Sequence, residues 1–438
     1  MSKKPSTAST KTVDGFSFIQ TVADIKEFVL NQNGLRVLYQ KRPDTGIITT
    51  NITYLVGARD EMCRDTGLAH MLEHMLFKPT KFDVEAKRDS SSMMFERETG
   101  CVLNANTWKD RTTYFFSYPK EYFERALQIE AERMVGVILT DKELAPEKMN
   151  VLSEYDMNNG DPHFALAVQM SRAAFNSHPY GHETIGFRED IEDYTAQQLE
   201  RFYRNYYRPD NAILMIIGDV DEETALNLVK KFFSEHKNPE SEIPRLNIRE
   251  PKQEGERRVT IERPSTQNIV SIGFKHPGFP SAGWFETAIL MDVLTGSEES
   301  ILYKQLVDSG KASSVEASIE PASDESMGTI NVSLAKGISH SSIEDLVKKT
   351  ISTLDTKTIA GHVKKAKVKF IAGEKFTRDS SLKLAQELTE YVSSGKWESF
   401  GKTIEILDSI TPASVIARTK LCFDKQKLIV GTFIGNKQ

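Results

Sequence analysis

Hydrophobic and polar positions alternate along the first part of the chain in a pattern typical of β-strands. The alternation runs through residues 25–61, and Asp44-Thr45-Gly46 supplies a turn within it. A second strand-rich stretch covers residues 102–117, and a helical pattern follows over residues 120–137. This mixture of strands and helices predicts an α+β arrangement.

Two further helices are predicted from their start and stop signals. One opens near Thr66 and ends at Pro79. The other begins at Pro146, a residue suited to the first helical turn, and stops at Asn158-Asn159-Gly160. Both helices carry titratable side chains at helical spacing.

A helix followed by a strand occurs twice in the sequence. Thr195-Ala-Gln-Gln-Leu begins one helix, which precedes an apolar strand over residues 212–218. Thr411-Pro-Ala-Ser-Val begins another, which precedes a strand over residues 428–435. A helix–strand pair is common, so chance similarity is the alternative to an internal duplication. Duplication predicts two similar α+β domains, each ending in this unit.

The expected domain limits follow from a change in composition. Residues 237–256 are polar and charged and contain proline, which is typical of an interdomain linker. We therefore predict a flexible tail over residues 1–14, an N-terminal domain over 15–236 and a related C-terminal domain over 257–438. A chain of 438 residues is too long for one ordinary core, which agrees with two domains.

Composition and charge exclude several classes of protein. The net charge of −6 gives no electrostatic footprint for a nucleic acid, and no apolar run is long enough for a membrane span. The polar start lacks a secretory signal, and three scattered cysteines favour reduced thiols. We therefore expect a cytoplasmic protein. The alternatives are the mitochondrial matrix or, if the natural sequence begins upstream, the periplasm.

Residues 70–74 read His-Met-Leu-Glu-His. On a helix, His70 and His74 are one turn apart and point the same way, while Glu73 lies beside both. Zinc accepts imidazole nitrogen and carboxylate oxygen, and three protein ligands leave a fourth position for water. Glu73 could accept a proton from such a water and pass it to a leaving amine. The alternative is a pair of histidines that only make hydrogen bonds in a core.

A third ligand should be acidic and lie on another helix. Glu147 and Glu154 are about two helical turns apart and face one way, so the spacing alone leaves either open. His178 and His182 are a rival ligand pair, but the proline and glycine between them favour a turn.

Two segments resemble the pitrilysin family of zinc peptidases. His70-Met-Leu-Glu-His-Met-Leu-Phe77 is similar to the family's zinc-binding helix. Glu147-Lys-Met-Asn-Val-Leu-Ser-Glu154 is similar to the segment that carries the third ligand at the second of two glutamates. The resemblance implies one zinc ion per chain, with ligands His70, His74 and Glu154, a catalytic base at Glu73, and Glu147 orienting the site.

A third segment resembles the edge strand on which the family lays the substrate backbone. This segment covers residues 100–107. The resemblance implies substrate contacts by Asn104 and Ala105 of this segment and by Phe77 of the zinc-binding segment. Ser177-His-Pro-Tyr-Gly181 and Ile185-Gly186 resemble another, structural landmark. The implied fold has two related α+β halves, each a mainly antiparallel sheet packed with helices. Two such units, on one chain or two, would enclose a chamber for unfolded peptides.

The second half departs from the family pattern at one point. Active members carry an Arg and a Tyr, seven residues apart, that reach the substrate carbonyl across the chamber. Val307 and Ser314 stand at the matching positions here, and neither can supply a long-reach donor. Lys304 or Lys311 is a possible substitute.

We therefore expect an endopeptidase subunit that hydrolyses unfolded peptides together with a second, homologous chain supplying the Arg and Tyr. A self-sufficient homodimer is the rival enzyme hypothesis. A non-catalytic assembly subunit, similar to the core proteins of a respiratory cytochrome complex, is the rival of another class. The retained set of His70, Glu73, His74 and Glu154 favours an enzyme.

Overall fold

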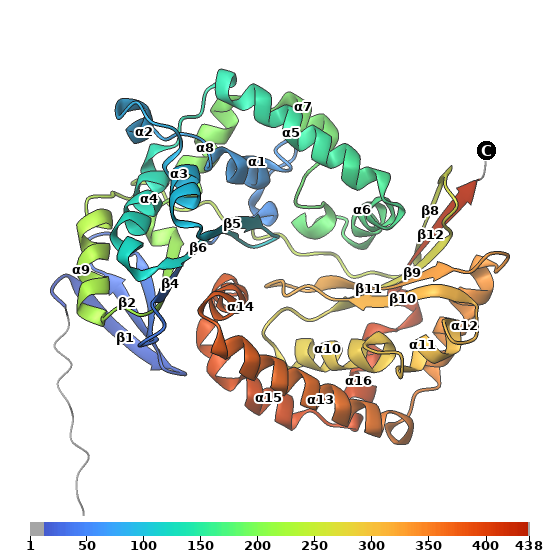
Figure 1. Ribbon diagram of the computed structural model, residues 1–438. Coiled ribbons are helices and arrows are strands. Elements are labelled where there is room, and N and C mark those ends of the chain that lie inside the picture. Colours follow the sequence, from blue (N-terminus) through green and yellow to red (C-terminus); the bar gives the residue numbers. More distant parts are fainter. Residues whose placement is uncertain (1–12, 437–438) are drawn as a thin grey trace, which may run out of the picture.

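A computed structural model of the chain describes residues 13–436, which form two β-sheets packed with helices (Figure 1). The predicted α+β class is confirmed. Most of the predicted tail, residues 1–12, lies outside the described residues. Asp14, at the end of that tail, pairs with Lys230 at 2.8 Å between Oδ2 and Nζ. Among the described residues, no helix is both long and apolar enough to cross a bilayer.

The first sheet has seven strands in the order β1-β2-β3-β7-β4-β6-β5. They are β1 (Phe16–Val22), β2 (Ile25–Leu30), β3 (Arg36–Lys41), β4 (Ile47–Tyr54), β5 (Val102–Thr107), β6 (Thr112–Pro119) and β7 (Ala212–Gly218). Only β3 and β7 pair in parallel, so the sheet is mainly antiparallel. The apolar β7 is buried along its whole length because it lies in the middle of the sheet. Strand β5 forms an edge.

Between residues 13 and 236, the described part of the first half, the chain also forms nine α-helices. They are α1 (Leu68–Met75), α2 (Lys81–Glu85), α3 (Ser91–Thr99), α4 (Phe123–Gly136), α5 (Asp141–Gly160), α6 (Pro162–Ala174), α7 (Arg188–Asp193), α8 (Ala196–Tyr206) and α9 (Glu222–Phe233). Helices α1 and α4 pack against strands of the first sheet.

The predicted start of the helix at Pro146 is wrong, because α5 begins at Asp141. The Thr140 side chain accepts a hydrogen bond from the Glu143 N–H at 3.3 Å and so caps the helix earlier. Pro146 lies inside α5, where its missing N–H removes one backbone hydrogen bond. The predicted end, at Gly160, is confirmed.

The second sheet has five strands in the order β10-β11-β9-β12-β8. They are β8 (Arg257–Pro264), β9 (Ile269–His276), β10 (Ala312–Ser318), β11 (Ser326–Leu334) and β12 (Ile429–Asn436). The helices of this part are α10 (Ala282–Thr295), α11 (Ile301–Leu306), α12 (His340–Ser352), α13 (Thr356–Asp379), α14 (Ser381–Ser393), α15 (Thr403–Ser409) and α16 (Pro412–Cys422). Residues 237–256 contain neither helix nor strand, and the domain limits placed around them stay a prediction.

The repeated helix–strand unit has the same place in both sheets. Thr195 caps α8 and Thr411 caps α16, each through its side-chain oxygen. Strand β7 pairs parallel with β3 and antiparallel with β4. Strand β12 likewise pairs parallel with β8 and antiparallel with β9. This shared topology supports the duplication rather than a chance similarity.

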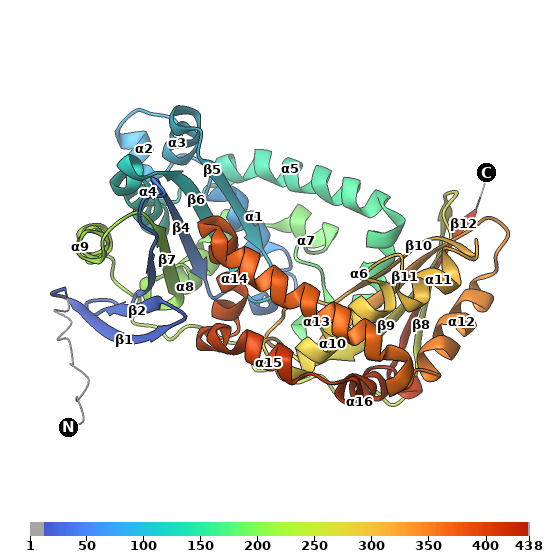
Figure 2. The same ribbon diagram turned by 60° about the horizontal axis from the view of Figure 1, so that its bottom comes forward.

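Each half of the chain packs a helix on the sheet of the other half (Figures 1 and 2). Helix α14 lies against β4 and β7 of the first sheet, and α6 lies against β8, β9 and β12 of the second. Leu38, Ile213 and Met215 of the first sheet therefore belong to the same core as the helices of the second half. The two halves share buried apolar surface instead of meeting only through a linker.

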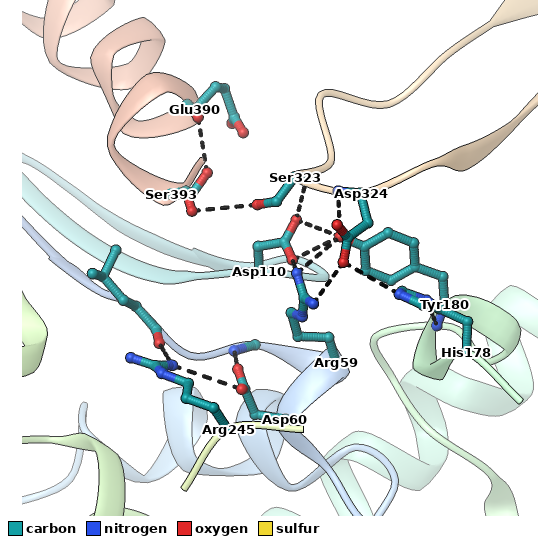
Figure 3. Close-up of polar contacts among 12 residues, drawn as sticks. Arg59, Asp60, Asp110, His178, Tyr180, Arg245, Ser323, Asp324, Glu390 and Ser393 are labelled. Carbon is teal, nitrogen blue, oxygen red and sulfur yellow. Dashed lines mark hydrogen bonds and ion pairs between the residues drawn. The ribbon is translucent and has the colours of Figure 1, made fainter. Parts of the chain in front are cut away.

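A polar cluster around the buried Asp110 also joins the two halves (Figure 3). Asp110 accepts hydrogen bonds from Arg59 Nη1 at 2.8 Å, the Tyr180 hydroxyl at 2.7 Å and the Ser323 N–H at 2.8 Å. Arg59 also pairs with Asp324 at 2.7 Å. Ser323 and Asp324 lie in the β10–β11 loop, so this cluster fixes that loop beside the β5–β6 turn.

Candidate metal centre

Helix α1 separates an apolar face from the face that carries His70, Glu73 and His74. Its buried residues are Leu68, Ala69, Met71, Leu72 and Met75. The three polar side chains lie between this buried face and solvent. The predicted segregation of the two faces is therefore present in the fold.

The start of α1 is fixed by a glutamate and two glycines. Glu61 accepts hydrogen bonds from the N–H groups of Gly67 at 2.7 Å and Ala69 at 2.9 Å. Gly67 and Gly186 both have positive φ, and a Cβ at Gly186 would lie 2.3 Å from the Thr66 carbonyl oxygen. The loop containing Ile185-Gly186 thus contacts the backbone just before the predicted metal ligands.

Helix α5 crosses α1 and brings Glu154 to both histidines. Glu154 Oε2 lies 3.8 Å from His70 Nε2 and 3.7 Å from His74 Nε2. One potential ligand atom from each of the three residues lies within 4.8 Å of the others. Within residues 13–436 this is the only group of three or more His, Cys, Asp or Glu side chains so placed.

The donor set fits zinc. Two imidazole nitrogens and one carboxylate oxygen match the ligands of catalytic zinc sites. Burial, together with the charge of His74, lowers the pKa of His70 to about 3, so its ring is neutral and has a free lone pair at pH 7. His70 Nδ1 is buried and has no hydrogen-bond partner among residues 13–436, while Nε2 faces Glu154.

The half-buried side chain of Glu73 lies beside this group. Burial raises the pKa of Glu73 to about 7, the nearby charge of Glu154 adds to this rise, and a hydrogen bond from Thr107 and the charge of Arg111 oppose it. Thr107 Oγ1 donates to Glu73 Oε2 at 2.5 Å. A carboxylate with a raised pKa next to a metal-binding group can accept and return a proton near neutral pH.

Glu147, the other candidate glutamate, lies farther from His70. Its Oε2 is 3.5 Å from His74 Nδ1, and its Oε1 pairs with Lys78. Burial tends to raise the pKa of Glu147, but hydrogen bonds from Lys78 and Asn150 outweigh it and the net pKa is lowered. Glu147 therefore contacts the back of the His74 ring as a carboxylate, as expected for a group that orients a ligand.

The residues predicted to contact substrate lie around the edge strand. Strand β5 is an edge of the first sheet, and Asn104 and Ala105 lie on it. Asn104 Oδ1 accepts a hydrogen bond from the Ala105 N–H at 2.8 Å, so this backbone donor is already paired. Phe77 follows the end of α1 and packs against the Tyr114 ring, with 6.2 Å between centroids.

The rival histidines lie apart from this group, in the loop around the short helix Pro179–Gly181. His178 Nε2 is 3.4 Å from Asp324, and His182 Nε2 is 3.0 Å from Glu61. Each ring thus has its own acidic neighbour, and each serves the packing of this loop. The predicted turn between them is confirmed.

The two positions that differ from the family's Arg and Tyr lie in the second half of the chain. Val307 caps the end of α11 and packs against the second core, while Ser314 lies on β10. Lys304 and Lys311 are exposed. Figures 1 and 2 place α11 and β10 far from α1, so none of these side chains lies at the metal centre of its own chain.

Three residues at the site, each with a contact of its own, were not predicted as functional. Lys78 pairs with Glu147, Thr107 donates to Glu73, and Arg111 donates to Asn106 and pairs with Glu390 of α14. Thr107 is the last residue of the predicted edge strand, and this position was the feature of the sequence that could have indicated a role at the site. Nothing local connects Arg111 with Glu390.

Two sequence profiles of one peptidase family match most of the chain. "Insulinase (Peptidase family M16)" matches residues 36–187, and "Peptidase M16 inactive domain" matches residues 193–370. A curated relative, zinc protease PqqE of Helicobacter pylori, is 33% identical over 292 residues. The aligned part is 66% of this chain and 65% of that relative, so the match spans just under two thirds of its length.

Solved structures share the fold. A protease from Helicobacter pylori superimposes with a TM-score of 0.88 at 25% identity, covering 94% of this chain and 100% of that one. A chain of complex III₂ from Candida albicans gives a TM-score of 0.74 at 14% identity and covers 95% of each chain, which shows the fold alone. The chain belongs to peptidase family M16, the pitrilysin-type family, as its motifs predicted.

Proposed function

We propose that this protein is a zinc-dependent endopeptidase subunit that hydrolyses unfolded peptides. The observation that carries the proposal is the convergence of His70, His74 and Glu154 from two helices beside the half-buried carboxylate of Glu73. The names of relatives as zinc proteases support it. The ion, when bound, would act as a Lewis acid and activate water.

The protein's own side chains have separate roles in this proposal. His70, His74 and Glu154 hold the ion, and Glu147 orients His74. Glu73 takes a proton from the attacking water and returns it to the leaving amine. The substrate adds as a further strand to β5, where main-chain hydrogen bonds tolerate many sequences.

The test is the substitution Glu73→Gln. The amide is nearly isosteric but cannot accept the proton, so hydrolysis of a flexible reporter peptide should fall to background while bound zinc is unchanged. Zinc should be measured by elemental analysis after purification without added metal. Turnover near the wild-type rate in Glu73→Gln would remove Glu73 as the base. A wild-type chain without zinc would contradict the proposal as a whole.

We further propose that activity needs a second chain of the same fold. The support is the pair Val307 and Ser314, which occupy the positions of the family's Arg and Tyr. Val307 caps the end of α11 and Ser314 lies on β10, and Figures 1 and 2 show both elements far from α1. The isolated chain should bind zinc and hydrolyse peptides about a hundredfold or more below an efficient peptidase, because contacts to the transition state are missing. Kinetics at several concentrations, with sizing, would test this. High turnover by a monomer would contradict it, and high turnover only as a dimer of identical chains would favour the homodimer.

A scaffold role is the second candidate function. It is favoured by the similarity in fold to a chain of complex III₂ and by the match of residues 193–370 to an inactive-domain profile. A scaffold needs no bound metal, so the zinc measurement on the purified chain separates the two candidates.

A further inference from the structure

Thr107 lies at the end of the edge strand β5 and contacts the side chain of Glu73. Its hydroxyl donates to Glu73 Oε2 at 2.5 Å. Thr107 is 9% exposed, so little water competes for this contact. A hydroxyl that donates to a carboxylate forms a charge-assisted hydrogen bond, which is shorter and stronger than a neutral one.

The backbone around Thr107 is held firmly. Thr107 is opposite Thr112 in the β5–β6 pairing, and the N–H of the next residue donates to the Arg111 carbonyl at 2.8 Å. On its other side, the Asn106 side chain accepts from Arg111, which also pairs with Glu390 of α14. The donor is therefore fixed by the sheet and by the second half of the chain, whereas the Glu73 carboxylate is the end of a flexible side chain.

We propose that Thr107 is a positioning residue for Glu73. Its hydroxyl holds one carboxylate oxygen in place, so that the other oxygen is available to the attacking water. The proposal rests on the proposed function of Glu73 as the base. Thr107 belongs to β5, the strand to which the substrate would add. The same strand would therefore position both the base and the substrate. A structural role, in which Thr107 only fills space in the strand, is the competing interpretation.

Three substitutions separate these interpretations. Thr107→Val removes the hydroxyl at nearly constant volume, and Thr107→Ser keeps it. Thr113→Val is the matched control, because Thr113 is buried in the neighbouring strand and its hydroxyl meets Thr53 Oγ1 at 3.1 Å, away from Glu73. The full chain should be assayed with whatever partner gives it peptidase activity.

The expected result is a selective loss of kcat. In Thr107→Val, kcat for a reporter peptide should fall about tenfold, with KM and bound zinc within about twofold of wild type. Thr107→Ser should retain most of kcat, and Thr113→Val should change only the thermal stability. Wild-type kcat in Thr107→Val, or an equal loss in Thr107→Ser, would overturn the proposal.

Crystal structures of the metal-free wild type and Thr107→Val provide a readout that does not depend on activity. The Glu73 carboxylate should occupy one position on Thr107 in the wild type and should move or populate several rotamers in Thr107→Val. An unmoved Glu73 in Thr107→Val would overturn the positioning role. If Glu73 is released in Thr107→Val while no form of the protein hydrolyses peptides, the positioning role stands and the proposed peptidase function fails.

Discussion

At the scale of single residues, the two glutamates of α5 have different surroundings although they lie two turns apart on one helix. Glu154 is 36% exposed in its side chain and faces the Nε2 atoms of both histidines. The Glu147 side chain is 6% exposed, forms an ion pair with Lys78 and lies beside the Nδ1 atom of His74. These contacts agree with the proposed roles, in which Glu154 binds the metal and Glu147 orients His74.

Substitution of the two glutamates tests this assignment. Glu154→Gln should lose most of the bound zinc, because two histidines alone hold the ion poorly. Glu147→Gln should keep much of the zinc and lower activity about tenfold, as changes in the partners of metal ligands do. Elemental analysis and peptide hydrolysis on both variants provide the measurement. A zinc-free Glu147→Gln with a zinc-loaded Glu154→Gln would mean that the two roles are reversed.

At the scale of elements, the position of α1 depends on a close backbone contact at its start. Gly186 has φ +83°, and an added Cβ would lie 2.3 Å from the Thr66 carbonyl oxygen. The Tyr194 hydroxyl also donates to that carbonyl oxygen, and Phe187 donates its N–H to Thr66 Oγ1 at 2.9 Å. The loop after the turn at 179–181 thus determines where α1, the helix with the proposed metal ligands, begins.

Gly186→Ala should therefore weaken zinc binding without touching a ligand. The new methyl group cannot be accommodated without moving residues 66–67, and positive φ adds backbone strain of about 1 kcal/mol or more. Gly160→Ala is the control, because within residues 13–436 no atom outside its own stretch of α5 lies within 4 Å of the added Cβ, and φ is not positive. Zinc affinity, measured by competition with a chelator, and the midpoint temperature of thermal unfolding should both fall in Gly186→Ala and not in the control. Equal affinity in both variants would show that this contact does not position α1.

At the scale of the whole molecule, the two halves form one cooperative structure. Helix α14 covers part of the first sheet and α6 part of the second, and Trp397 Nε1 donates to the buried Glu27 at 2.8 Å across the halves. Asp110 binds three donors, of which Ser323 belongs to the other half. Separating the halves would expose apolar sheet surface and leave buried charges unpaired.

The full chain should consequently unfold in one thermal transition. Calorimetry of the metal-free protein should give one peak whose van't Hoff and calorimetric enthalpies agree. Asp110→Ala should lower the midpoint of that peak, because Arg59 and Tyr180 lose their buried partner at a cost of about 3 kcal/mol or more. Two separate peaks in the wild type would contradict a shared core.

Short-range features of this protein could be predicted from its sequence. The spacing of His70, Glu73 and His74 places them on one side of any helix, because that relation depends only on helical geometry. The start of α5 was placed wrongly, because Pro146 is tolerated inside the helix when Thr140 caps it earlier. The choice of Glu154 as the glutamate beside the histidines depended on the family resemblance, because the spacing within α5 does not distinguish Glu147 from Glu154.

The sequence by itself determined the α+β class, the repeated helix–strand unit and the face of α1 that carries His70, Glu73 and His74, because periodicity and capping are local properties. Only the tertiary structure decided which helix covers which sheet, since each half buries apolar surface that matches a helix of the other. It also decided that Thr107 meets Glu73 and that Arg111 meets Glu390. Such contacts join residues far apart in the chain, and they exist only once the packing of helices on sheets has fixed the distances between them.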